Sequence, residues 1–132
     1  MDERVTTAGI AIKDGRVFVA RREKGGPLSC RWEFPGGKQH WGESDADTLR
    51  REYMEELEAL VEVGEEVVSF DFENKGTLYH LRAHLISFIT EPKRLSVHTE
   101  AKWVSLEELF LLDMAPSDGR IRKAVASLLL NS

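Results

Sequence analysis

The sequence predicts an α/β fold in which a mixed β-sheet lies between α-helices. Strand-like segments precede, separate and follow the helical ones, and no regular βαβ repeat orders them. Apolar residues make up 42% of the chain and charged residues 31%, as in soluble globular proteins. The length of 132 residues is sufficient for one proper core, so we expect residues 1–132 to form a single domain.

A hairpin is predicted near the N-terminus. Within residues 5–12, the side chains that alternate onto one side are Thr6, Ala8, Ile10 and Ile12. Alternation of this kind indicates a β-strand. The Asp14-Gly15 pair is a hairpin signal, so Val17–Ala20 is expected to form the return strand.

A loop and a short strand are expected next. Residues 21–31 are polar, contain two glycines and include Pro27, which favours a loop. Trp32–Phe34 predicts a short strand, and we expect a tight turn at Gly36-Gly37 to end it.

The first helix is expected to begin after Ser44. Ser44 can cap the N-terminus, and Asp47 follows three residues later, with acidic side chains at the positive end of the helix dipole. The helix should run to about Leu60.

Two long strands are predicted after this helix. Residues 61–72 and 77–89 are strand-like, and Asn74-Lys75-Gly76 supplies the turn between them. An irregular segment is expected around Pro92, before a short strand over residues 101–104.

Two helices are expected to close the chain. Ser105 has its own capping pattern and predicts a short helix, and Ser117 is expected to cap a final helix that ends near Leu130. The inward-facing residues of that helix should be Ile121, Val125, Leu128 and Leu129.

Charge and composition disfavour several function classes. The formal net charge is −5 and no basic tract stands out, which argues against a duplex nucleic-acid binder. No apolar run approaches the roughly 18 residues of a membrane helix, and the N-terminus lacks a signal-peptide pattern. The single cysteine, Cys30, excludes an intrachain disulfide, fits a reducing, cytoplasmic location and is expected to serve packing. We expect a monomer or a homodimer.

The predicted helix carries three carboxylates that can face one point. Glu52, Glu55 and Glu56 stand at i, i+3 and i+4. The alternative is a solvated acidic face, but at about 100° per residue Glu56 falls only about 60° from the centre of the apolar stripe. That stripe consists of Ala46, Leu49, Tyr53, Leu57 and Leu60. Like charges beside a buried face repel one another, and a hard cation such as Mg²⁺ would relieve that cost.

Neighbouring residues favour the metal site over the solvated face. Arg51 can pair with Glu55 and hold its carboxylate in place. Glu43 can reach the cluster or pair with Arg51, and the glycines Gly36 and Gly37 can bring a backbone carbonyl close to the same cation.

This spacing resembles the Nudix box. In the box, five residues stand between a glycine and the first glutamate, and seven residues stand between that glutamate and an arginine. The matching residues are Gly37, Glu43, Arg51, Glu52, Glu55 and Glu56. Two residues depart from the pattern, because Tyr53 occupies an apolar position and Glu58 replaces the glycine that normally ends the helix. We expect the helix to continue by a turn at Glu58, with Gly64 as a later stop.

The resemblance implies a Nudix fold and the hydrolysis of a nucleotide substrate in which a nucleoside diphosphate is linked to another group. It implies Mg²⁺, or alternatively Mn²⁺, at the phosphates. The residues implied to hold metal are Gly36 through its carbonyl, Glu52, Glu55 and Glu56. Arg51 would orient the carboxylates and Glu43 would support that network.

The family often has a separate acid, as base or further metal ligand, before the strand that carries Trp103. Glu100 is our candidate, because it is the only carboxylate between Glu91 and Glu107. A surface glutamate is the alternative reading. His98 is a further candidate base.

The wider chain is similar to the MutT-like branch, the nucleoside triphosphate pyrophosphohydrolases. This resemblance implies that Arg22 contacts the substrate and that Asp118 contacts the base. For Arg22 the alternative is an ordinary charge at the end of a strand. For Asp118 it is an acid in the first turn of a helix, stabilised by the helix dipole. An ionised aspartate only accepts hydrogen bonds, so Asp118 suits the exocyclic amino group of cytosine at least as well as oxidised guanine. Either Trp32 or Phe34 could stack on the base, although at least one should pack in the core.

Three functions are compatible with these features. The first is hydrolysis of a nucleoside triphosphate, of the 8-oxo-dGTP or CTP/dCTP type, to the monophosphate and pyrophosphate. The second is a catalytically silent nucleotide-binding domain, which the presence of every box acid disfavours. The third is a Nudix enzyme for another diphosphate, such as a sugar nucleotide; the short chain favours a small substrate.

Overall fold

A computed structural model describes residues 1–26 and 28–131. Over these residues the fold has seven strands and three helices. Their bounds are β1 Asp2–Lys13, β2 Arg16–Arg22, β3 Trp32–Glu33, β4 Gly36–Lys38, α1 Asp45–Leu57, β5 Val61–Asn74, β6 Thr77–Phe88, β7 His98–Val104, α2 Leu106–Leu109 and α3 Pro116–Leu130. The part of the predicted loop at Pro27 lies outside the described residues. None of the helices in the described chain is long and apolar enough to cross a membrane.

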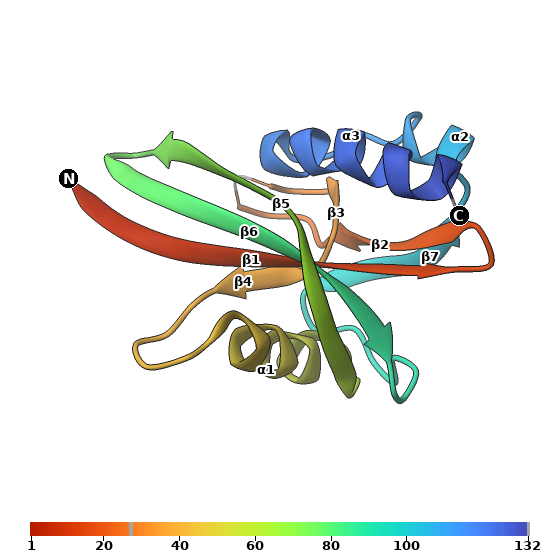
Figure 1. Ribbon diagram of the computed structural model, residues 1–132, viewed down its shortest axis with the longest axis horizontal. Coiled ribbons are helices and arrows are strands. Elements are labelled where there is room, and N and C mark those ends of the chain that lie inside the picture. Colours follow the sequence, from red (N-terminus) through yellow and green to blue (C-terminus); the bar gives the residue numbers. More distant parts are fainter. Residues whose placement is uncertain (27, 132) are drawn as a thin grey trace.

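The strands form one mixed sheet between two helical layers. The strand order is β3-β2-β1-β6-β5, with β4 paired to β1 and β7 paired to β2. β1 and β6 run parallel, and the other pairs run antiparallel. Helix α1 covers one face, and α2 and α3 cover the other (Figure 1). The predicted fold class is therefore confirmed.

Each helical layer has its own apolar core. On the α1 side, Leu49, Tyr53 and Leu57 pack with residues of β1, β2, β5 and β6. On the α3 side, Ile121, Val125 and Leu129 are buried as predicted, whereas Leu128 is only partly buried. Burial of apolar area on both faces holds the two layers against the sheet.

Both predicted hairpin turns are present. Asp14 and Gly15 adopt positive φ angles of 53° and 74° between the paired residues Lys13 and Arg16. Lys75 and Gly76 do the same, with φ angles of 50° and 81°. Two consecutive positive φ angles match the right-handed twist of the flanking strands. The second turn is shorter than predicted, because Asn74 still pairs with Thr77.

The predicted tight turn at Gly36-Gly37 is wrong, because both glycines belong to strand β4. They pair with Ala8 and Thr7 of β1. A Cβ atom on Gly36 would meet the backbone oxygen of Thr7 and would lie 2.8 Å from Ala8 Cα. The glycines therefore serve close approach to neighbouring atoms, not reversal of the chain.

Helix α1 begins as predicted and ends earlier. The Ser44 Oγ accepts from the Asp47 amide at 3.1 Å, and the Asp47 carboxylate accepts from the Ser44 amide at 3.3 Å. The predicted continuation to Leu60 is wrong, because Glu58 adopts a left-handed conformation with φ 49°. The amide of Ala59 then donates to Tyr53 O at 3.3 Å, as in a helix that ends at a glycine. This turn buries Ala59 completely and directs the chain into β5.

Replacing Glu58 by glycine should raise the free energy of unfolding by about 0.5–1 kcal/mol. A side chain in the left-handed region costs roughly 1–2 kcal/mol, from which the greater chain entropy of glycine is subtracted. The contact that is lost, Glu58 Oε2 to Arg94 Nε at 3.6 Å, is exposed and contributes little. Urea denaturation measures the change. Glu58→Ala keeps the Cβ atom and should show no gain, so equal stability of the two variants would contradict a strained helix end.

The N-termini of the last two helices differ. Ser105 caps α2 as predicted, with its Oγ accepting from the Glu108 amide at 3.2 Å. The predicted cap at Ser117 is wrong, because α3 begins with Pro116, two residues earlier than such a cap implies, and Ala115 is the capping residue. Proline suits this position since it needs no hydrogen bond for an amide.

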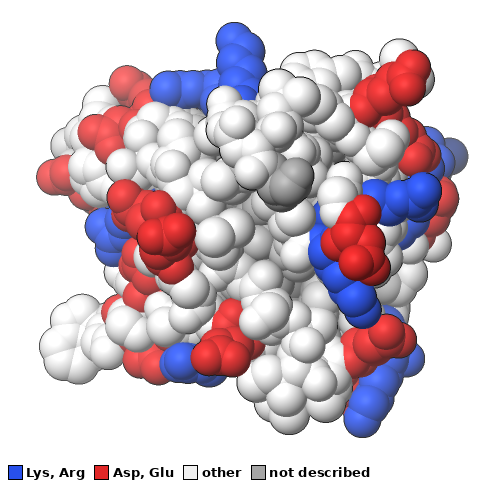
Figure 2. Space-filling view, turned by 45° about the vertical axis from the view of Figure 1, so that its right-hand side comes forward, with Lys and Arg blue, Asp and Glu red and all other residues white. Residues whose placement is uncertain are grey.

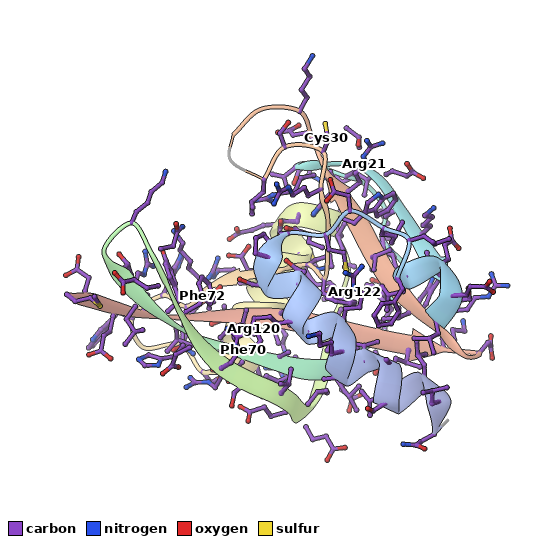
Figure 3. The ribbon with its side chains drawn as sticks, turned by 90° about the horizontal axis from the view of Figure 1, so that it is seen from above. Arg21, Cys30, Phe70, Phe72, Arg120 and Arg122 are labelled. Carbon is purple, nitrogen blue, oxygen red and sulfur yellow. The ribbon has the colours of Figure 1, made fainter. Side chains whose placement is uncertain are left out.

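Arg120 of helix α3 contacts two residues of β5. The Arg120 guanidinium lies 3.8 Å from the centroid of the Phe70 ring, and Figure 3 shows the two side chains together. Arg120 Nη1 also donates to the Asp71 carbonyl at 3.3 Å. These contacts fix the first turns of α3, which carry Asp118, relative to the sheet.

Cys30 lies in the loop that follows β2. It is half-buried, and its Sγ atom is 3.6 Å from Ser29 Oγ. Its carbonyl accepts from Arg21 Nε at 3.1 Å, and both residues are labelled in Figure 3. These contacts fit the packing role expected from the sequence.

Candidate active site

A cleft of about 760 Å³ is lined by parts of β1 and β4, the second half of α1 and the start of α3. It brings together most of the predicted site residues, which come from four elements. Those that line it are Arg22, Gly36, Glu52, Glu55, Glu56 and Asp118. Carboxylates from α1 lie in one part of its wall, and Asp118 from α3 lies in another.

Two glycines allow α1 to approach the sheet closely. A Cβ atom on Gly9 would lie 2.5 Å from the hydroxyl oxygen of Tyr53, which donates to the Gly9 carbonyl at 3.2 Å. A Cβ atom on Gly37 would occupy the place of the Glu52 carboxylate, at 2.7 Å from its Oε2 atom. The close packing of α1 therefore puts the Glu52 carboxylate directly against β4.

Arg51 organises the polar side of α1. Its Nε and Nη2 atoms donate to the two oxygens of Glu43 at 2.7 and 3.0 Å. Its Nη1 atom donates to Glu52 at 2.9 Å and to Glu55 at 3.3 Å. The Arg51 hydrogen bonds, helped by the His40 amide, lower the pKa of Glu43 to about 2. Arg51 therefore holds three carboxylates, as predicted for the pairs with Glu43 and Glu55.

Glu56 is the buried member of the carboxylate group. Its residue is 7% exposed, and its Oε2 atom has no hydrogen-bond partner among the described residues. Burial, followed by the negative charges of Glu33 and Glu52, raises the pKa of Glu56 to about 9. A buried carboxyl oxygen without a partner, next to further carboxylates, is suited to a divalent cation. The donor set therefore fits a hard metal ion.

Metal binding should become tighter as the pH rises toward about 9. The raised pKa means that Glu56 holds a proton in the metal-free protein near neutrality, and a cation must displace it. For the same reason the contribution of Glu56 to metal-free stability is largest below 4.5 and declines as the pH rises toward 9. Calorimetric Mg²⁺ titrations at about pH 6 and pH 8 should show affinity rising by up to about tenfold per pH unit. A pH-independent affinity in this range would contradict the displacement.

Asp118 lies against the cleft and is nearly buried. Its Oδ1 atom accepts from the Phe34 amide at 2.9 Å, and the residue is 9% exposed. Burial raises the pKa of Asp118 to about 8, with the Phe34 amide acting in the opposite direction and Glu33 adding to the rise. Phe34 and Trp32 are both buried in the core, although Phe34 also lines the cleft.

A model of the NUDIX domain matches residues 3–125 of the chain. The chain belongs to the Nudix family. The family prediction is confirmed, and the protein is a Nudix hydrolase, a member of the enzymes that act on acid anhydrides. Members of this family generally use a divalent metal and small nucleotide substrates.

Curated relatives of this Nudix hydrolase belong to MutT-like proteins. It is 33% identical over 121 residues to the CTP pyrophosphohydrolase of Escherichia coli (strain K12), covering 92% of this chain and 90% of that one. It is 35% identical over 121 residues to the putative 8-oxo-dGTP diphosphatase 2 of Mycobacterium tuberculosis (strain CDC 1551 / Oshkosh), with coverages of 89% and 84%.

Solved structures agree with the fold. The solution structure of the E. coli ORF135 protein superimposes with a TM-score of 0.81 at 32% identity, covering 97% of this chain and 91% of that one. The MutT Nudix hydrolase from Burkholderia pseudomallei gives a TM-score of 0.80 at 24% identity, with coverages of 95% and 99%. At 24% identity, the similarity to the Burkholderia pseudomallei protein supports the fold alone.

Three predicted residues do not line the Nudix cleft in the described chain: Glu43 and Arg51 are joined to it through Glu52 and Glu55, whereas Glu100 is not. Glu100 is exposed on β7, where it pairs with Arg21 in the strand register, and it is not among the described residues that line the cleft. A role for Glu100 as base or metal ligand stays a prediction without geometric support. His98, the other candidate, is buried and contacts Glu33.

Glu33 is the main site residue that sequence reasoning missed. It is 8% exposed, lines the cleft and faces both Arg22 and His98. A charged residue between Trp32 and Phe34 in a short apolar strand was the available signal, since charged residues are rarely buried without a partner.

Proposed function

We propose that this protein hydrolyses a nucleoside triphosphate to the monophosphate and pyrophosphate, with Mg²⁺ or Mn²⁺ as cofactor. The observation that supports the proposal most is the joint lining of one cleft by a carboxylate cluster and by a nearly buried aspartate. The carboxylates suit metal-bound phosphates, and Asp118 suits the edge of a base. The relatives named for CTP and for 8-oxo-dGTP support a nucleotide with an amino-bearing base.

The proposed metal-binding set consists of the Gly36 carbonyl, Glu52, Glu55 and Glu56. When bound there, the cation would polarise phosphoryl oxygens and lower the pKa of a water molecule. Arg51 keeps Glu52 and Glu55 directed to the cleft, and Glu43 fixes Arg51 from its other edge. Because this bonding is complete without substrate, the carboxylates need little reorganisation when substrate binds.

Arg22 is the proposed contact for the phosphates. Its Nη1 atom lies 3.6 Å from Glu56 Oε1, so its positive charge is at the carboxylate cluster and next to the cleft. A guanidinium there can stabilise the negative charge of a phosphate group. On the face shown in Figure 2, basic and acidic side chains both lie around a largely uncharged centre, and no continuous basic stripe of described residues crosses it.

The proposed substrate class is tested with a panel of canonical and oxidised nucleoside triphosphates and with nucleoside diphosphate derivatives such as sugar nucleotides. With Mg²⁺, triphosphates that carry an amino group on the base should have the highest kcat/KM. A preference for a sugar nucleotide or a dinucleoside polyphosphate would overturn the triphosphate assignment while leaving the family intact. Binding of a triphosphate without hydrolysis would identify a silent nucleotide-binding domain.

Replacing Asp118 by asparagine should change the order of preference among bases. Asp118 Oδ1 accepts from the Phe34 amide, and Asp118 lines the cleft. Above a pH of about 8 the Asp118 carboxyl is ionised, and asparagine would then present an amide donor that the carboxylate lacks. Discrimination between bases should shift by about tenfold or more, because an unpaired polar group in a site costs roughly 1–3 kcal/mol. An unchanged ranking of kcat/KM would remove Asp118 from base recognition.

A further inference from the structure

A buried histidine–glutamate contact reaches the cleft and has no part in the chemistry proposed above. His98 Nε2 is 2.9 Å from Glu33 Oε2, and the His98 side chain is fully buried. The other ring nitrogen, Nδ1, has no hydrogen-bond partner among the described residues. Burying an imidazole with one unsatisfied nitrogen is unfavourable, and an apolar residue would fill the same core position without that cost.

This pair is connected to Arg22 through the second oxygen of Glu33. Arg22 Nε lies 3.6 Å from Glu33 Oε1, while Arg22 Nη1 lies 3.6 Å from Glu56 Oε1. Glu33 therefore faces one edge of the guanidinium and leaves the other directed at the carboxylate cluster. His98, Glu33 and Arg22 form a continuous polar chain that reaches the cleft from the core.

The backbone pairing places Arg22 opposite His98. The pairing of β2 with β7 shifts between Arg21 and Arg22, and Arg22 is aligned directly with His98. An irregularity of this kind re-aims a side chain and interrupts regular pairing. The Glu23 amide donates to the Val97 carbonyl at 3.0 Å, so the residues just beyond β2 and just before β7 also lie next to each other.

We infer that Glu33 and His98 are positioning residues that hold the Arg22 guanidinium at the cleft wall for contact with a substrate phosphate. The inference rests on the proposed role of Arg22 and deepens it. His98 fixes the Glu33 carboxylate, and Glu33 fixes the Nε edge of Arg22. With Nε held in this way, the position of Nη1 would not depend on its contact with Glu56 alone. In metal sites, a carboxylate that binds the far nitrogen of a metal-bound histidine fixes the orientation of the ring. We infer the same role for a carboxylate that lies behind a guanidinium.

A double-mutant cycle between Glu33 and Arg22 tests this inference. Glu33→Gln keeps the shape of the side chain and should lower kcat/KM by about tenfold or more, mainly through KM. In an Arg22→Ala background, the same change should cost less than about twofold, because the group that Glu33 positions is gone. Equal losses in both backgrounds, or no loss in the wild-type background, would overturn the positioning role.

Variants at His98 give a second readout. His98→Asn should raise KM, and His98→Gln should recover part of the loss, because its longer amide can still donate to Glu33. His80→Asn is the matched control: His80 is 2.8 Å from Glu3 and 2.7 Å from Asp71, and neither carboxylate is among the described residues that line the cleft. Equal KM values for wild type, His98→Asn and His80→Asn would show that His98 serves stability alone. If a His98 variant does not fold, the Glu33 cycle decides.

The double-mutant cycle can fail or succeed independently of the proposed triphosphate substrate. It is run with whichever substrate of the panel has the highest kcat/KM. If that substrate is a sugar nucleotide, the triphosphate assignment fails, yet the coupling between Glu33 and Arg22 is still measured. Coupling with a triphosphate substrate supports both, and additivity with a triphosphate substrate contradicts the positioning role alone.

Discussion

Glu56→Gln is expected to lower kcat by roughly 10²- to 10⁴-fold while leaving the fold intact. Glu56 has a buried oxygen without a partner among the described residues, and we propose that a cation occupies that position. Glutamine has the same shape but cannot supply a carboxylate charge to the cation. In the metal-free protein the substitution should be tolerated, because burial already favours the uncharged form of Glu56.

In Glu56→Gln, turnover should fall while the stability of the metal-free protein should not. Turnover with Mg²⁺ should collapse, and thermal unfolding without metal at about pH 8 should show equal or higher stability. Glu55→Gln should also abolish turnover, although its carboxylate is more exposed. Glu65→Gln, at an exposed position of β5, is the control and should leave both quantities unchanged. Turnover near wild type in Glu56→Gln and in Glu55→Gln would remove these residues from the metal site.

Gly37→Ala is expected to lower activity by displacing one carboxylate. The new Cβ atom would take the place of the Glu52 carboxylate, with Oε1 and Oε2 at 2.5 and 2.7 Å. Glu52 is also held by Arg51, so it cannot move without breaking that hydrogen bond. We expect kcat/KM to fall by about 10²-fold, because small misplacements of catalytic groups are costly. Stability should fall by roughly 1–3 kcal/mol from overpacking.

The stability effect is measured by urea denaturation, with two other alanine variants for comparison. Gly36→Ala should destabilise more than Gly37→Ala, because its Cβ would meet backbone atoms of β1 that cannot rotate away. Gly119→Ala is the control for stability: no described atom lies within 4 Å of its Cβ position, and it is in α3. Alanine there should be neutral or stabilising by up to about 1 kcal/mol. Full activity in Gly37→Ala would contradict the packing of Glu52 against β4.

Local patterns were enough to predict much of the fold. The hairpin turns at Asp14-Gly15 and Lys75-Gly76 depend on residues that tolerate positive φ, and the cap at Ser44 depends on neighbours in the chain. The joint position of Glu52, Glu55 and Glu56 at one cleft was predictable because helical spacing places them on one side of the apolar stripe. Burial of Glu56 agrees with that geometry.

The features that could not be predicted depend on contacts distant in sequence. Strand β4 is three residues long and consists mainly of glycine, so it has no alternation, and only its pairing with β1 defines it. The helix end at Glu58 depends on the burial of Ala59, which compensates for an unfavourable backbone conformation. Glu33 and His98 lie 65 residues apart, and their contact requires β2 to bring β3 and β7 together.

The most direct test of the proposed activity is the identity of the two products. Each nucleoside triphosphate is incubated with the protein and Mg²⁺, and the nucleoside monophosphate, pyrophosphate and inorganic phosphate are measured separately. The proposed activity predicts equal amounts of monophosphate and pyrophosphate, no inorganic phosphate, and loss of both products when a chelator removes the metal. Release of inorganic phosphate with the nucleoside diphosphate, or turnover that persists with the chelator, would contradict it.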